Sequence, residues 1–336
     1  MQDEHIFMNV FFMEGKDMND SQILSELKKY QNKIRINNIC MAVVYIAIPI
    51  GFFMALMDYV NGKNFIISLV VAIAGCIVVG PLGKNGARLK KVKKDFIGEH
   101  IIKSLLAEKI EIKQYTPSNF ISKDIIKGSS IMPSYDRISG SDYISGTYKG
   151  VNISYSDIVL QRIETYRDSN GRRRTRHVTV FKGHFFRMYL GNKIDGYVRI
   201  VERKNPRKKG FFADLLGSAA DLVGMKSNTI ELENEAFNNQ FEVKTDNDQL
   251  AFYILTPHFM ESVSRADELA DGYTNMLFKD NRVDIAMNNY VDSFEVKRNI
   301  YTQNALDECR MLMRKDLDIL LSIADEILTK DRLFNA

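Results

Sequence analysis

Two long apolar runs, joined by a short polar loop, constrain this chain more than any other feature of its sequence. The first run, residues 36–57, has 22 residues without a charge, and the second, residues 65–83, has 19. A helix needs about 20 apolar residues to cross a bilayer, because each residue advances it by roughly 1.5 Å. The alternative is a buried hairpin of a soluble protein, but neighbouring uncharged runs of this length rarely fit one soluble core. The sequence therefore predicts a transmembrane helical hairpin over residues 36–83.

The charges that flank the two runs predict their orientation. Basic residues lie before the first span and after the second: Lys28, Lys29, Lys33, Arg35, Lys84, Arg88, Lys90, Lys91, Lys93 and Lys94. The loop between the spans has only Lys63, which Asp58 balances. Because basic flanks stay in the cytoplasm, we expect both termini to be cytoplasmic and the loop external. Neither span contains an ionisable residue, which favours an anchor over an ion or proton pathway.

The net charge of +4 is the sum of very unevenly distributed charges along the chain. Residues 1–94 carry 12 basic and 7 acidic residues, residues 95–227 carry 23 and 14, and residues 228–336 carry 11 and 21. The three parts therefore have net charges of +5, +9 and −10. We expect the basic middle part to face anionic lipid headgroups and the acidic part to face the cytosol or a basic partner. A content of 45% apolar residues and three Cys excludes a disordered chain and a disulfide scaffold.

Outside the spans, the pattern predicts an α+β fold: an antiparallel, β-rich cytoplasmic domain with a long C-terminal helix. Strand candidates adjoin one another without intervening helices, which argues against a doubly wound sheet. They cover residues 143–148, 151–163, 177–190, 197–203, 228–233, 241–245, 276–278 and 283–287. The predicted organisation is an N-terminal amphipathic helix over residues 1–35, the hairpin with spans 36–57 and 65–83, a basic juxtamembrane helix over 84–112, the α+β domain over 113–300 and the C-terminal helix over 301–336.

The C-terminal helix has a single apolar face. Leu306, Met313, Leu320 and Ile327 recur every seven residues along it. This face is expected to pack on the sheet of the same chain. A coiled-coil homodimer is the alternative, because a seven-residue apolar repeat also supports one.

No motif for catalysis, a cofactor or a metal emerges from the sequence. The five histidines are far apart and none has a zinc-ligand spacing, and neither a phosphate-binding glycine loop nor a Gly-x-Ser-x-Gly motif is present. Glu231, Glu233 and Glu235 could hold a cation, but a solvated strand face explains them better. We therefore expect no catalytic, cofactor-binding or metal-binding residue.

Basic residues instead suggest contact surfaces. The run of arginines near residue 174 predicts either a solvated hairpin tip or a contact with anionic lipid headgroups or an acidic protein. Nucleic acid is not favoured, because no aromatic platform accompanies the run. A second basic cluster precedes an apolar segment within residues 203–225, which suits either an interfacial helix or an insertion packed on the domain. The candidate contact residues are Lys90, Lys91, Lys93, Lys94, Arg172, Arg173, Arg174, Arg176, Arg207, Lys208, Lys209, Phe211 and Phe212.

The segment over residues 230–260 resembles a known family. It reads IELENEAFNNQFEVKTDNDQLAFYILTPHFM, and the Val180-Phe181-Lys182-Gly183 stretch fits as well. Both are similar to the bacterial domain-of-unknown-function family 3137, over roughly residues 120–295. The resemblance implies two N-terminal spans, a soluble domain and a bacterial inner-membrane location, and it transfers no catalytic residue. The C-terminal helix and the arginine run lie outside it.

Together these observations predict a membrane-anchored, non-catalytic binding or scaffolding module. Its expected partners are the bilayer, anionic headgroups and a protein or a second copy bound through the C-terminal helix. Two alternatives stay open: an anchored enzyme whose site is assembled from dispersed residues, and a homo-oligomeric membrane assembly protein. A deep pocket that gathers His177 or His184 with carboxylates would favour the enzyme.

Overall fold

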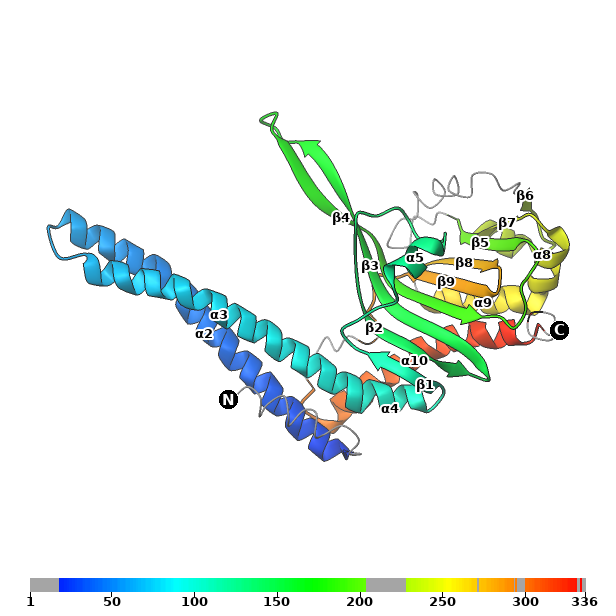
Figure 1. Cartoon of the computed structure of the whole chain (residues 1–336), viewed down its shortest axis with the longest axis horizontal. Coiled ribbons are helices and arrows are strands. Elements are labelled where there is room, and N and C mark those ends of the chain that lie inside the picture. The colour runs from blue at the N-terminus through cyan, green and yellow to red at the C-terminus, as the bar shows by residue number, and fades with distance from the viewer. Residues whose placement is uncertain are drawn as a thin grey trace. The chain divides into compact units, whose positions relative to one another are not determined.

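The chain divides into two compact units in the computed structural model. One comprises Met1–Ile101 with Val296–Cys309, and the other comprises Ile102–Glu295 with Arg310–Ala336. The described residues are 18–203, 228–270, 272–292, 294, 300–330 and 333. Figure 1 shows the helices and strands of both units.

The first unit is built on two long helices, α2 (Asp20–Val60) and α3 (Ile66–Ile97). Asn19 begins α2 with a capping box, since its side chain accepts from the Gln22 N–H and the Gln22 side chain accepts from the Asn19 N–H. The predicted N-terminal helix and first span are thus one continuous helix. Both helices are long and apolar enough to cross a membrane, and their large apolar side chains over residues 36–78 are largely exposed. The expected two apolar N-terminal helices are confirmed.

Small residues let α2 and α3 approach each other closely. A Cβ added to Gly51 would lie 3.1 Å from the Cβ of Ala72, and one added to Gly86 would lie 2.7 Å from the amide nitrogen of Asn37. Asn37 also links the helices, because its amide donates to the Leu82 carbonyl and its oxygen accepts from Asn85. Close backbone approach and interhelical hydrogen bonds are the usual means of holding helices together in lipid.

The second unit contains a sheet of nine strands in the order β1-β2-β3-β4-β9-β8-β5-β7-β6, in which every pair is antiparallel. The strands are β1 (Glu111–Thr116), β2 (Arg137–Tyr148), β3 (Val151–Arg167), β4 (Arg173–Tyr189), β5 (Tyr197–Glu202), β6 (Asn228–Ile230), β7 (Phe241–Thr245), β8 (Tyr273–Lys279) and β9 (Arg282–Asn288). The predicted antiparallel α+β fold is confirmed. Lys149 and Gly150 both have positive φ at the β2–β3 turn, as a tight hairpin requires.

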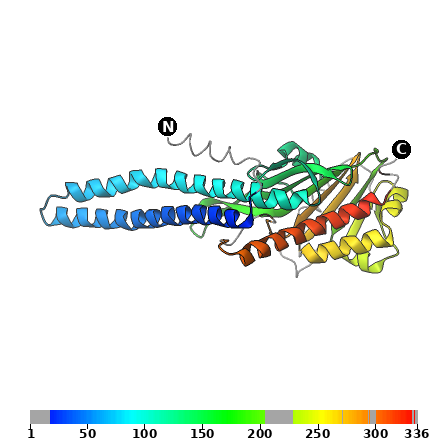
Figure 2. The same cartoon turned by 90° about the horizontal axis from the view of Figure 1, so that it is seen from below.

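Helices cover the two faces of this sheet. On one face lie α9 (Pro257–Ala270) and the second half of α10 (Gln303–Leu328), and Figure 2 shows them alongside each other. The ring of Phe259 in α9 contacts that of Phe278 in β8, with 6.0 Å between the centroids. On the other face, α5 (Lys123–Gly128) and its flanks bury Ile121, Ile126 and Ile131 against side chains such as Phe181.

Four short helical segments and one strand differ from what the sequence predicts. The helix that leaves the second span continues through the π-helical turn η1 (Gly98–Ile102) and ends with α4 (Lys103–Ala107), five residues before the predicted end at residue 112. Glu111 onwards forms β1 instead, because its backbone pairs with β2. The sequence also missed α7 (Glu235–Gln240) and α8 (Asp248–Ile254), whose Asn234 and Asn247 caps each accept an N–H three residues on.

The apolar face of α10 is used within the chain. All four members of its seven-residue repeat are buried: Leu306, Met313, Leu320 and Ile327. Because these side chains already pack inside one copy, the repeat is not free to form the seam of a coiled-coil dimer.

Two buried arginines of the sheet differ in how their charge is compensated. Arg187 of β4 donates two hydrogen bonds to Asp284 of β9, with Nε–Oδ1 and Nη2–Oδ2 distances of 2.5 and 2.7 Å. Arg199 of β5 is 1% exposed, and none of its guanidinium nitrogens has a hydrogen-bond partner among the described residues. Burial lowers the pKa of Arg199. The first arginine therefore depends on its partner, whereas the desolvation cost of the second is only partly offset, by the charge of Glu242.

Replacement of Gly51 by Leu is expected to weaken the packing of α2 on α3 by about 1–3 kcal/mol, because the larger side chain collides with Ala72. The measurement is the SDS fraction at which the purified protein unfolds, followed by circular dichroism. Gly80→Leu is the matched control, since nothing lies within 4 Å of a Cβ added there. Equal unfolding of the two variants would contradict this packing.

Two substitutions, of the partner of Arg187 and of Arg199 itself, should have opposite effects on stability. Asp284→Leu leaves Arg187 buried without its partner and should cost about 3–5 kcal/mol of stability. Arg199→Met removes a buried charge that forms no hydrogen bond in the described part of the chain, so the melting temperature of this variant should equal or exceed that of the wild type. Thermal unfolding in detergent measures both. A marked loss of stability in Arg199→Met would show that this guanidinium has a stabilising partner.

Candidate functional site

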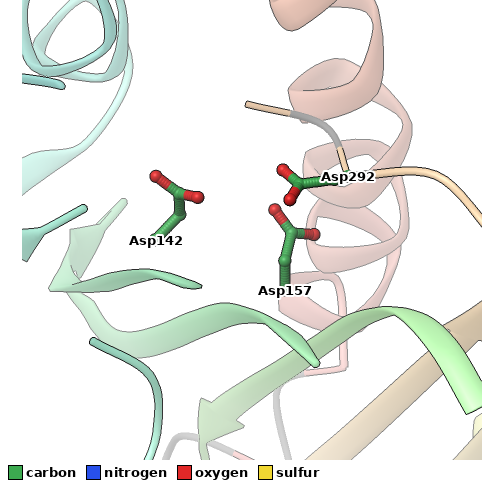
Figure 3. A group of neighbouring side chains, drawn as sticks. All are labelled: Asp142, Asp157 and Asp292. Carbon is green, nitrogen blue, oxygen red and sulfur yellow. The ribbon is translucent and has the colours of Figure 1, made fainter. Parts of the chain in front are cut away.

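Three carboxylates converge in the sheet unit: those of Asp142 in β2, Asp157 in β3 and Asp292 after β9. One oxygen of each lies within 4.8 Å of the others. Figure 3 shows Asp157 next to Asp292, with Asp142 across from them. Asp142 and Asp157 are 0% and 4% exposed. Two unit charges about 4.8 Å apart repel by roughly 3.5 kcal/mol at an effective dielectric constant of about 20, so this arrangement needs compensation.

A β-bulge brings Asp142 into the cluster. The register of β2 against β3 shifts between Ser141 and Ile144, and Asp142 has a φ of 56°. A bulge turns a side chain away from its regular alternation, which here points that of Asp142 inward. The hydroxyl of Tyr115 donates to its Oδ1 over 2.9 Å. Burial raises the pKa of Tyr115, and the charge of Asp142 raises it further, so the phenol stays protonated and donates.

Asp157 is held by neighbours on two adjacent strands. It lies opposite His184 of β4 in the β3–β4 register. Its Oδ1 accepts from the Tyr155 hydroxyl at 2.9 Å and from Nδ1 of His184 at 2.5 Å. Its Oδ2 is buried and has no hydrogen-bond partner in the described part of the chain. Within the described residues, Oδ1 of this carboxylate therefore has hydrogen-bond partners and Oδ2 has none.

Both ring nitrogens of His184 are engaged. The backbone N–H of Val291 donates a hydrogen bond to Oδ1 of Asn289. This bond fixes the orientation of the Asn289 amide, so that its nitrogen lies 3.0 Å from Nε2 of His184. The tautomer assigned from this network has its proton on Nδ1, directed at Asp157. Burial lowers the pKa of His184, but the charge and hydrogen bond of Asp157 outweigh this and raise it overall. Uptake of a second proton at Nε2 would require the Asn289 amide to turn.

A pocket of about 210 Å³ opens beside this cluster. It is lined by Ser139, Gly140, Ser141, Asp157, Ile158, Val159, Lys182, Gly183, Val291 and Asp292. A Cβ on Gly183 would lie 1.9 Å from the Met287 carbonyl oxygen, and one on Gly140 would lie 2.4 Å from the Asp157 carbonyl oxygen. Only glycine fits at these two pocket-lining positions, because the backbone of a neighbouring strand leaves no room for a Cβ atom.

The acidic cluster offers oxygen donors of the kind that hard cations prefer. No metal ligand is predicted from the sequence, and these three residues do not stand out in it. They are 15 and 135 residues apart in sequence, so no local spacing connects them. Only a weak indication is present in the sequence: Asp157 is the one charged residue in residues 153–160, which are otherwise apolar or hydroxylated. Glu231, Glu233 and Glu235, the cation candidates from the sequence, are exposed.

The predicted arginine run lies at the tip of a two-stranded arm, defined as residues 162–178. Beyond Gln161, β3 no longer pairs with β2, and the strands of the arm pair only with each other, as Figure 1 shows. The arm carries six arginines and two carboxylates, a net charge of +4. Arg176 is paired with Glu164 at 2.7 Å and Arg174 with Asp168 at 3.2 Å. Ile163 and Tyr166 are 40% and 48% exposed.

The other predicted contact residues divide into two groups. Lys90 and Lys91 are exposed on α3, and Lys93 and Lys94 are half-buried there. Burial lowers the pKa of Lys93. The remaining candidates lie outside the described residues: Arg207, Lys208, Lys209, Phe211 and Phe212.

One solved structure aligns with much of the chain. It is the crystal structure of the mycobacterial trehalose monomycolate transport factor A, TtfA, with a TM-score of 0.31 and 12% identity over 66% of this chain and 92% of that one. A similarity of that degree supports no conclusion about fold or function. No curated protein matches the sequence.

A family profile matches part of the sheet unit. The matched region begins within β4, after the arginine run, and ends with the last residue of α10. It therefore includes the C-terminal helix, which the resemblance seen in the sequence did not cover. The predicted resemblance is confirmed: residues 179–328 match the family described as "Protein of unknown function (DUF3137)".

Proposed function

We propose that this protein is a membrane-anchored, non-catalytic binding module whose sheet unit works at the cytoplasmic surface of a bacterial inner membrane. The observation that carries the proposal is the apolar surface of α2 and α3. Their large side chains are exposed along both helices, including Ile46, Phe53 and Ile67 at 62%, 63% and 71%. Exposure of so extensive an apolar surface to water is energetically unfavourable, whereas a bilayer would bury it.

The basic flanks of the two helices support the orientation. Lys90 and Lys91 remain exposed beyond the second span, where anionic headgroups would meet them. The loop between the helices has no such excess of basic residues. The positive-inside rule then assigns both termini and the sheet unit to the cytoplasm.

The arm is the part of the sheet unit best suited to reach an acidic surface. Its tip presents Arg172 and Arg173, which form no ion pair within the described part of the chain, next to an exposed tyrosine, Tyr166. Arginines near an anionic surface gain roughly 1 kcal/mol each, and a tyrosine ring suits the interface between water and lipid. Anionic lipid headgroups are therefore the proposed contact.

An anchored enzyme is the rival function, and the acidic cluster bears on it. Asp157 lines the pocket and is hydrogen-bonded to His184, a pairing that an enzyme could use. However, His184 is 4% exposed, does not line the pocket, and has both ring nitrogens bonded inside the protein. A general acid or base must reach the proton that it transfers. This geometry favours binding over catalysis.

The orientation predicts which positions a membrane-impermeant thiol reagent reaches in intact cells. In a variant with Cys40, Cys76 and Cys309 replaced by Ser, a cysteine introduced at Asn61 should be labelled from outside. A cysteine introduced at Asn170 should be labelled only after permeabilisation. The opposite pattern would reverse the orientation, and labelling of neither position after solubilisation would indicate blocked thiols.

The arm should be protected from trypsin by anionic lipid. For the full chain in vesicles, cleavage within the arm is expected to be several-fold slower with phosphatidylserine than with phosphatidylcholine alone, and high salt should restore it. Arg173→Glu should abolish the protection at the remaining Arg174. Arg137→Glu, which reverses an exposed charge outside the arm, is the matched control and should retain it. Equal cleavage rates in the two lipids would contradict the contact.

A further inference from the structure

We propose that Asp142, Asp157 and Asp292 form a binding site for a hard divalent cation of the size of Ca²⁺. The proposal concerns the acidic cluster alone and is independent of what the arm contacts. Three carboxylate oxygens within 4.8 Å of one another are the geometric basis, and two of the three side chains are almost fully buried.

The unsatisfied oxygen of Asp157 is the second observation. This side chain is more than nine-tenths buried, and its Oδ2 has no hydrogen-bond partner within the described residues. Buried polar atoms are almost always satisfied, so an exception of this kind indicates a missing ligand, ion or water. Oδ2 belongs to the carboxylate that lies next to Asp292 in Figure 3. A cation between the carboxylates would satisfy it and would also offset their mutual repulsion.

Within the described residues, the hydrogen bonds around Asp157 all reach its Oδ1 and leave Oδ2 open. Tyr115 and Tyr155 donate to Oδ1 of Asp142 and of Asp157, but a hydroxyl carries no positive charge. His184 is directed at Oδ1 of Asp157 and is held there by Asn289. Lys182 lines the pocket, yet it forms no ion pair with the three carboxylates in the part of the chain that is described.

The donor set and its spacing select the class of ion. Carboxylate and hydroxyl oxygens, with Ser141 within 3.5 Å of Asp292, suit Ca²⁺ and Mg²⁺ rather than zinc or copper. Oxygens on opposite sides of Ca²⁺ are about 4.6–5.2 Å apart, whereas those around Mg²⁺ are about 4.2 Å apart at most. The three carboxylate oxygens all lie within 4.8 Å of one another, a separation that the larger ion accommodates without rearrangement. The open pocket leaves room for the water ligands that three carboxylates do not provide.

Terbium luminescence tests the proposal, because Tb³⁺ is a hard cation close to Ca²⁺ in size. The chain has no Trp, and two tyrosine hydroxyls bond the proposed ligands, so excitation of tyrosine should sensitise a bound Tb³⁺. We expect the full chain in detergent to give this emission at one ion per molecule. Ca²⁺ should displace Tb³⁺ at least ten times more effectively than Mg²⁺ does.

Asp292→Asn is the test variant, since Asp292 is only half-buried and its change should spare the fold. It should lose at least tenfold in Tb³⁺ and Ca²⁺ affinity. The wild type should also melt several degrees higher in Ca²⁺ than in EGTA, and the variant should not. Glu233→Gln, which removes an exposed carboxylate elsewhere, is the matched control and should bind as the wild type does.

Three results would overturn the proposal. They are a wild type without sensitised emission, an affinity that Asp292→Asn leaves unchanged, and stronger binding of Mg²⁺ than of Ca²⁺. Metal analysis of wild-type protein dialysed against Ca²⁺ requires no variant. A content well below one ion per chain would equally reject the site.

Discussion

The antiparallel pairing of β3 with β4 is the interaction on which most of the sheet unit depends. The two strands are 17 residues each, and their register runs without a break in pairing from Ile153↔Met188 to Arg167↔Arg173, apart from one shift near Leu160. At one end this ladder carries the buried core and the Asp157–His184 pair. At the other end it leaves the sheet and becomes the arm. A one-residue slip would move every side chain of a strand to the opposite face, so this register fixes both the core around these strands and the position of Asp157 in the acidic cluster.

The rules that predict burial from sequence succeed here where a side chain is apolar. The strands around Phe181, Val198 and Ile285 and the apolar face of α10 follow from the periodicity of apolar residues, and the structure has them at nearly the predicted positions. Local chemistry decides such elements. The edge strand β1 was missed for the opposite reason. Its six residues EIKQYT show little apolar periodicity, and they form a strand because they pair with β2.

The acidic cluster could not be predicted because it depends on tertiary contacts. Asp142 is turned inward by a bulge, Asp292 follows β9 on a distant part of the chain, and neither has a neighbour in sequence that would suggest a ligand. The buried charges Arg187 and Arg199 are similar, because strand patterns place them on one face without saying which partner lies there. The arginine run was predicted as a hairpin tip or a contact surface, but the separation of the arm from the sheet depends on where β2 and β9 stop pairing.

The arm and the acidic cluster have opposite charges, yet they lie on the same pair of strands. From the Asp157↔His184 pair to the Arg167↔Arg173 pair there are ten residues, or about 33 Å of extended strand. The Debye length at physiological ionic strength is only about 8 Å, so the charge of one feature has little influence on the other. An acidic surface can therefore attract the arm without being repelled by the cluster, and a cation in the cluster would not be displaced by the arginines. Any coupling between the two would have to pass through the strands themselves, by a change in twist or register rather than through the electric field.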